Sequence, residues 1–92
     1  MRPLTHALPG ALAELLRHAP LSPGKVSFAW RAAVGTNLER VTSVRLDGHV
    51  LVVEAADQHW AREITRSSSV ILPRLRTLLG NDTIERILVR EP

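Results

Sequence analysis

The chain has 92 residues, 45% of them hydrophobic, which is enough for one modest core, so we expect a single domain over residues 1–92. The absence of cysteine excludes a disulfide scaffold and a thiolate metal site, and the net charge of +3 permits a nucleic-acid partner without requiring one. No apolar run is long enough to cross a membrane, and MRPLTHALPG does not read as a signal peptide, so we expect a cytoplasmic protein with no membrane partner.

The first part of the chain predicts two helices. Apolar residues recur at helical spacing over about residues 5–19, which indicates an N-terminal amphipathic helix. For the second helix, Ser22 is a natural N-cap, Pro23 suits the first helical position, and Gly35 can end the helix in the left-handed conformation. Residues 37–40 can add one further turn.

After these helices the hydrophobic pattern changes to the alternation that is typical of strands. The pair Asp47-Gly48 stands between two β-branched runs, which is the strongest short-range signal for a β-hairpin. Near the end of the chain, Thr83 to Arg90 alternates well enough to predict a third strand.

A long helix is predicted between the hairpin and the third strand. Asp57 can cap it and Gly80 can end it. Pro73 cannot donate within a helix, so we expect either a kink or a restart capped within residues 67–69. The predicted fold is therefore α+β, in the order α-α-β-β-α-β, with a three-stranded sheet covered by helices on one face. In the predicted long helix, the face expected to pack against the core carries Trp60, Ile64, Ser67, Ile71, Leu75 and Leu78.

The chain lacks a recognisable catalytic constellation. Gly24-Lys25 resembles the end of a phosphate-binding loop, but no glycine lies five residues before Gly24, and Val26 replaces the magnesium-binding serine or threonine. His59 and Glu63 are one turn apart without an evident third ligand, so we interpret them as solvated helix surface. We predict a protein that is not an enzyme and that needs neither a cofactor nor a metal.

The two tryptophans are predicted to be core residues. Trp30 and Trp60 both fall on the apolar stripe of their helices, and Phe28 is the only other aromatic residue. A base-stacking platform usually needs several exposed aromatic side chains. We therefore expect each tryptophan to be buried, with its indole N–H hydrogen-bonded.

Arginines gather on the predicted long helix. Arg62, Arg66 and Arg76 lie opposite its apolar stripe, Arg74 lies near the edge, and Glu63 is the only acidic residue among them. Such a surface can follow a phosphate backbone, because each neutralised phosphate releases counterions. It can equally be an ordinary solvated helix face, and the sequence leaves both interpretations open.

A second set of residues shares the open face of the predicted sheet. Apolar side chains rimmed by arginine are typical of a protein-contact surface, which could also support a weak homodimer. Alternatively, the N-terminal helix covers this face. The set comprises Arg45, Val50, Val52, Arg86, Leu88 and Arg90.

Five short segments, taken in order, resemble one known family. They are WRAAVG at residues 30–35, Arg40-Val41-Thr42, LDGHVLVVEA at 46–55, HWAREI at 59–64 and LRTLLG at 75–80. Together they are similar to the DciA family, bacterial loaders or operators of the replicative helicase. The similarity spans about residues 22–89, which we expect to be the DciA-like core.

The resemblance implies a K-homology-like domain that binds DNA, interacts with the ring-shaped replicative helicase, and has no ATPase of its own. The GXXG clamp of K-homology domains is absent, because none of the five glycines are three residues apart. Contact with nucleic acid would then come from cationic side chains. The residues expected to make it are Lys25, Arg31, Arg62, Arg66, Arg74 and Arg76.

The function predicted from sequence is a non-enzymatic adaptor. It would bind DNA, single-stranded or mixed, without sequence specificity, and help load or operate the replicative helicase. The alternative is a protein-interaction or dimerisation module that uses the open sheet face and does not bind DNA directly.

Overall fold

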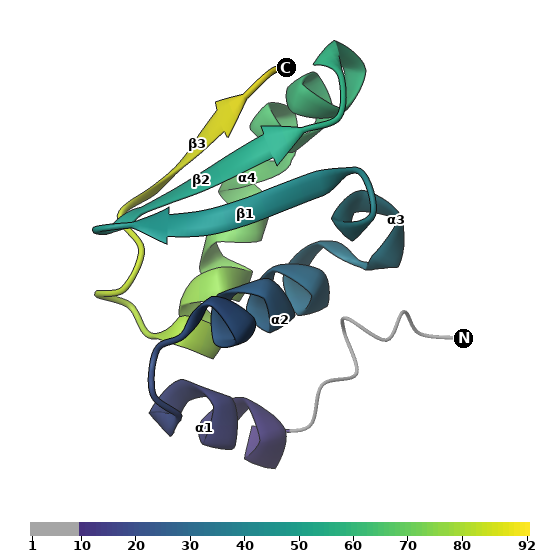
Figure 1. Cartoon of the computed structure of the whole chain (residues 1–92). Coiled ribbons are helices and arrows are strands. Elements are labelled where there is room, and N and C mark those ends of the chain that lie inside the picture. Colours follow the sequence, from purple (N-terminus) through teal and green to yellow (C-terminus); the bar gives the residue numbers. More distant parts are fainter. Residues whose placement is uncertain (1–9) are drawn as a thin grey trace.

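The structure, a computed structural model, describes residues 10–92 and contains within them one three-stranded sheet and four helices (Figure 1). The α+β class and the predicted element order are confirmed, with α3 as the further turn after the second helix. The predicted start of the first helix, near residue 5, lies outside the described residues. The elements are α1 (Gly10–His18), α2 (Pro23–Val34), α3 (Thr36–Glu39), β1 (Thr42–Asp47), β2 (Val50–Ala55), α4 (Gln58–Leu79) and β3 (Arg86–Arg90).

Helix α2 begins and ends where its local sequence predicts. The Ser22 hydroxyl accepts a hydrogen bond from the Lys25 backbone N–H at 3.1 Å, and Pro23 occupies the first helical position. Gly35 ends the helix with φ 88° and ψ 168°, an extended conformation rather than the expected left-handed helical one. Only glycine adopts that region at low cost. Glycine is therefore required at this position, as predicted, although the positive φ belongs to a different conformation.

The predicted hairpin is confirmed, with a loop displaced by one residue. Asp47 pairs with Val50, so the two-residue loop is Gly48-His49 and Asp47 belongs to β1. Gly48 has φ 60°, and no other residue type in the described chain has a positive φ. A single positive φ at the first loop position is the signature of a type II′ turn.

Helix α4 runs without interruption through its proline. It spans 22 residues with Pro73 inside it, so the restart expected within residues 67–69 is wrong. Ile71 and Leu75 are 3% and 0% exposed and anchor the helix to the core on both sides of Pro73, whose own side chain is exposed. Burial of these side chains outweighs the loss of one backbone hydrogen bond.

Strand β3 completes a mixed sheet of order β1-β2-β3. It pairs in parallel with β2, and α4 makes the connection between them (Figure 1). The strand begins at Arg86 rather than at the predicted Thr83. Thr83 does not join the strand: its hydroxyl donates a hydrogen bond to the Leu79 carbonyl, at 2.6 Å, at the end of α4. Ile84 is nevertheless buried, 1% exposed, which explains why the alternation extended that far.

The core lies between the sheet and the helices α2 and α4. Trp30 is 1% exposed, and its Nε1 donates to the Thr42 hydroxyl at 2.9 Å, which confirms the prediction for this residue. Trp60 is half-buried and packs against the rim of the core. Its burial was therefore overestimated. The largest fully buried side chains are Trp30, Leu51, Ile64, Leu75, Ile84 and Val53.

Candidate nucleic-acid interface

Three of the six cations predicted to contact DNA hold backbone carbonyls inside the fold. Lys25 is only 8% exposed, and its Nζ donates to the Ala19 carbonyl at 2.7 Å, just beyond the end of α1. Its ammonium therefore stabilises the α1–α2 connection. The other two, Arg74 and Arg76, lie on the second half of α4.

Arg74 and Arg76 tie α4 to neighbouring segments. Arg74 Nη1 donates to the Ala33 carbonyl at 3.1 Å, at the end of α2. Arg76 donates through Nε to Ile84 and through Nη2 to Glu85, at 3.1 and 3.2 Å from the two carbonyl oxygens. This fork fixes the segment that leads into β3, so it is engaged in structure rather than presented to solvent.

Arg62 and Arg66 form the exposed pair among the predicted residues. They lie one turn apart on α4 and line a shallow groove of about 290 Å³, whose other lining residues are Ala61, Thr65, Val89 and the acidic Glu91. The groove runs between α4 and β3. Two cations spaced by one helical turn beside a groove can contact an anionic chain that passes along it.

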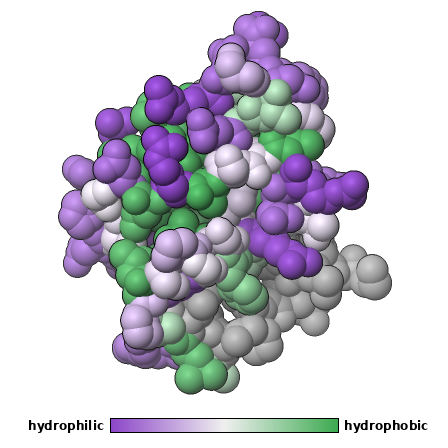
Figure 2. Space-filling model, in the orientation of Figure 1, coloured by the Kyte–Doolittle hydropathy of each residue, from purple (hydrophilic) through white to green (hydrophobic). Residues whose placement is uncertain are grey.

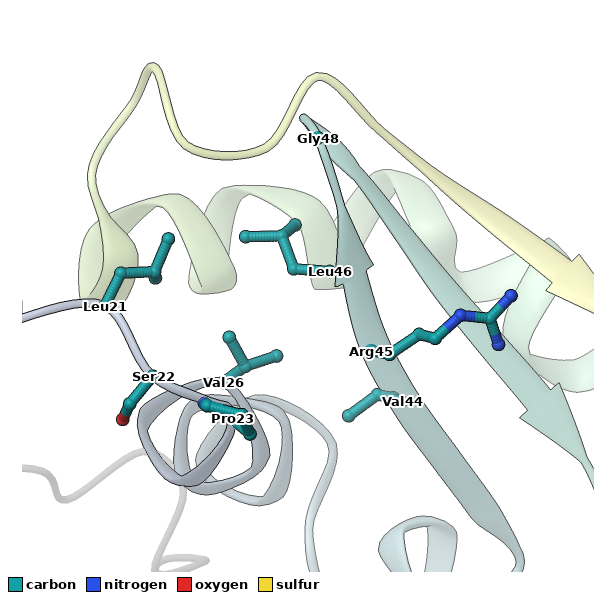
Figure 3. A pocket seen from close by; sticks show the side chains of 8 residues that line it. All are labelled: Leu21, Ser22, Pro23, Val26, Val44, Arg45, Leu46 and Gly48. Atoms are coloured by element: carbon teal, nitrogen blue, oxygen red, sulfur yellow. The ribbon is translucent and has the colours of Figure 1, made fainter.

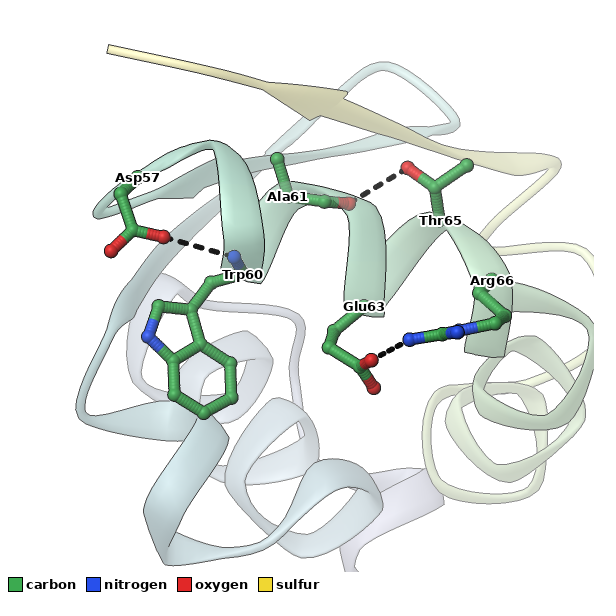
Figure 4. Close-up of polar contacts among 6 residues, drawn as sticks. All are labelled: Asp57, Trp60, Ala61, Glu63, Thr65 and Arg66. Carbon is green, nitrogen blue, oxygen red and sulfur yellow. Dashed lines mark hydrogen bonds and ion pairs between the residues drawn. The ribbon is translucent and has the colours of Figure 1, made fainter.

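Figure 4 shows the polar contacts of the first half of α4, including the ion pair of Arg66. Asp57 caps the helix by accepting from the Trp60 backbone N–H at 3.0 Å. Arg66 forms an ion pair with Glu63, and its side chain remains 73% exposed. An ion pair this exposed contributes about 0–1 kcal/mol, so it restrains Arg66 only weakly.

Arg31 is also exposed, on α2. It is the sixth predicted cation, and it stands apart from the groove-lining residues of α4. The structure therefore brings together two of the six predicted residues, leaves one exposed elsewhere, and uses three as internal hydrogen-bond donors.

The six residues predicted to form the open sheet face do lie on one face. Their positions follow from the register: the side chains that alternate with the core-facing ones on each strand fall into three cross-strand rows. Helix α1 packs against α4 and not over this face. The rows are Asp47–Val50–Arg86, Arg45–Val52–Leu88 and Ser43–Glu54–Arg90.

The apolar part of this face is small. Val52 is only 3% exposed, because its neighbours cover it, whereas Leu88 is 39% exposed. Arg45 and Glu54 form an ion pair across the strands at 3.6 Å. Figure 2 shows hydrophobic residues interspersed with hydrophilic ones over the strands rather than one continuous apolar surface.

An apolar groove between α2 and β1 was not predicted from the sequence. Its volume is about 350 Å³, and Leu21, Val26, Val44 and Leu46 point into it, while Arg45 points away (Figure 3). Leu21 is 55% exposed. An apolar residue outside any helical stripe, just before the N-cap of α2, was the available signal.

The described residues offer no group suited to a metal. Among residues 10–92, no three His, Cys, Asp or Glu side chains lie close enough to hold an ion. His59 packs edge-on against the Trp60 ring, with 5.0 Å between the ring centroids. None of the helices in this range is long and apolar enough to span a membrane.

The fold and its surfaces thus define a small α+β domain with arginines presented along one helix and one sheet face. A comparison with protein families finds a match over residues 3–89 to the family described as Dna[CI] antecedent, DciA. The chain belongs to the DciA family, which is associated with loading of the replicative helicase in DNA replication. No curated protein and no solved structure matches the chain significantly.

Proposed function

We propose that this chain is a non-enzymatic cytoplasmic adaptor that binds DNA and helps load or operate the replicative helicase. Membership of the DciA family supports the general role. The observation that carries the DNA-binding part is the exposed pair Arg62 and Arg66 beside the groove between α4 and β3.

Phosphate contact at this pair has a low structural cost. Neither arginine donates a hydrogen bond to a backbone carbonyl of the described fold, unlike Arg74 and Arg76. Arg66 would exchange the solvent-exposed carboxylate of Glu63 for a phosphate, which replaces one weak ion pair by another charge-assisted contact. Because the groove presents no aromatic side chain, we expect binding through the backbone of the nucleic acid and therefore without sequence specificity.

The test is a salt titration of binding to a fluorescent single-stranded oligothymidine, followed by anisotropy. The double variant Arg62→Gln, Arg66→Gln should bind more weakly, and the slope of log K against log salt should fall by about 1.4, since each lost phosphate contact removes roughly 0.7. Repeating the titration with a duplex of equal length shows which form of DNA is preferred.

A matched control makes the same change in net charge at a different surface. The double variant Arg45→Gln, Arg86→Gln removes two positive charges from the open sheet face. It should lower affinity slightly through the overall field and leave the slope nearly unchanged. Equal slopes for the wild type and the groove variant would show that Arg62 and Arg66 do not contact phosphate.

The open sheet face supports a second candidate function, a protein-interaction or dimerisation module. The favouring observation is that Val50 and Leu88 share that face and that no described helix covers it. Sedimentation velocity over a range of concentrations tests dimerisation, with Leu88→Asp as the variant, because Val52 is too buried for a surface test. A dimer that Leu88→Asp abolishes, together with no DNA affinity, would favour this candidate.

A further inference from the structure

Strand β3 forms an edge of the sheet. It pairs with β2 on one side, and within residues 10–92 no strand pairs with its other side (Figure 1). An edge strand presents unpaired N–H and C=O groups, which can accept an additional strand. Ile87 and Val89 are half-buried and pack against the core, which fixes the inner face of this edge strand.

The side chains of β3 alternate in a distinctive way. Arg86, Leu88 and Arg90 are exposed and point to the open face, while Ile87 and Val89 point toward α4. An added strand would therefore meet a cation, an apolar side chain and a second cation at alternate positions. Glu85 and Glu91 flank the strand. Because side chains alternate between the two faces, neither falls in the series formed by Arg86, Leu88 and Arg90.

This series disfavours pairing with a second copy of the chain. In an antiparallel pair of β3 strands centred on Leu88, Arg86 of each copy would lie directly opposite Arg90 of the other. In a parallel pair in register, each arginine would face its own counterpart. Like charges directly opposite one another destabilise strand pairing. Charged residues on an edge strand are a common protection against self-association.

We propose that β3 binds an extended acidic segment of a partner protein as a fourth strand of the sheet. The recognised segment carries carboxylates at positions i and i+4 and an apolar residue at position i+2. Its carboxylates lie opposite Arg86 and Arg90, its apolar side chain covers Leu88, and its backbone pairs with the edge. This proposal rests on Arg86, Leu88 and Arg90 and not on Arg62 and Arg66, although Val89 of the same strand also lines the groove beside those two arginines.

The test uses a fluorescein-labelled peptide with the central sequence Glu-Thr-Val-Thr-Glu, measured by anisotropy against the full chain. It should bind, and its counterpart Lys-Thr-Val-Thr-Lys should bind at least about tenfold more weakly, because each pair of opposite charges across strands becomes a like pair. In hydrogen exchange, the acidic peptide should protect amides of β3 and leave those of β1, the other edge strand, unchanged. N-methylation of the central valine should abolish binding by removing a backbone donor.

Charge exchange supplies the decisive variant. Arg86→Glu with Arg90→Glu should prefer the lysine peptide, which a merely unfolded chain would not do. Arg86→Gln with Arg90→Gln, a milder change, should lose the distinction between the two peptides, whereas Arg62→Gln with Arg66→Gln should keep it. Binding of the acidic peptide without protection of β3, or unchanged preference in either Arg86/Arg90 variant, would overturn the proposal and leave the DNA-binding proposal untouched.

Discussion

At the scale of single residues, one hydroxyl joins three elements. Trp30, at 1% exposure, donates from Nε1 to Thr42, and the same Thr42 hydroxyl donates to the Leu38 carbonyl at 2.8 Å. The indole N–H has no access to water, so its hydrogen bond is needed to avoid a desolvation penalty. The contact fixes α2 and α3 against the first residue of β1.

Replacing Thr42 by valine should therefore lower the free energy of unfolding by about 1–3 kcal/mol, the cost of leaving one buried donor without an acceptor. Urea unfolding followed by tryptophan fluorescence measures it. Thr42→Ser keeps the hydroxyl and should retain most of the stability. An unchanged free energy of unfolding in Thr42→Val, which keeps a methyl group and lacks the hydroxyl, would show that the hydrogen bond from Trp30 does not contribute to stability.

At the scale of elements, local signals predicted the helix and turn boundaries, and tertiary packing decided where they failed. Ser22 and Gly48 act through neighbours within three residues, so the sequence alone contains the information. The continuity of α4 through Pro73 is explained by burial of Ile71 and Leu75 in the core, which no local rule includes. β3 was predicted three residues too early because Ile84 is buried although it precedes the strand, so the apolar alternation continues beyond the paired residues.

Pro73 is expected to lower the stability of α4, because it lies inside the helix. Pro73→Ala restores a backbone N–H that can bond to the Ser69 carbonyl one turn before it, and it removes the steric clash of the ring. Part of the gain is offset because proline restricts the unfolded chain. We expect the free energy of unfolding to rise by about 1–2 kcal/mol in urea denaturation. Val70→Ala, at an exposed neighbouring position, should change it by less than about 0.5 kcal/mol. A loss of stability in Pro73→Ala would show that α4 depends on the geometry the proline imposes.

At the scale of the whole molecule, the basic residues divide by what they contact. Lys25, Arg74 and Arg76 bind backbone carbonyls, and Arg62 and Arg66 line the groove beside β3. All five were predicted to belong to one DNA-binding set, because a backbone carbonyl acceptor has no sequence signature. Ala33, the acceptor for Arg74, lies 41 residues away along the chain. The arginine face of α4 was predictable from helical period, whereas its division into structural and exposed cations was not.

This division predicts that, of two variants with the same loss of charge, one loses thermal stability and the other loses contacts with DNA. Lys25→Met with Arg76→Gln removes donors to the carbonyls of Ala19, Ile84 and Glu85, and it should cost at least about 2 kcal/mol of stability. For a domain of this size the melting temperature would fall by about 8 °C or more. Below that transition its salt slope for DNA binding should match the wild type. Arg62→Gln with Arg66→Gln should instead keep the melting temperature within about 2 °C, since exposed cations contribute little to stability. Its salt slope should be smaller in magnitude by about 1.4, because two phosphate contacts are lost. Calorimetry and the salt titration, run on both variants, separate the two roles. A groove variant that melts early, or a carbonyl-binding variant with a reduced slope, would show that the two groups of cations are not distinct.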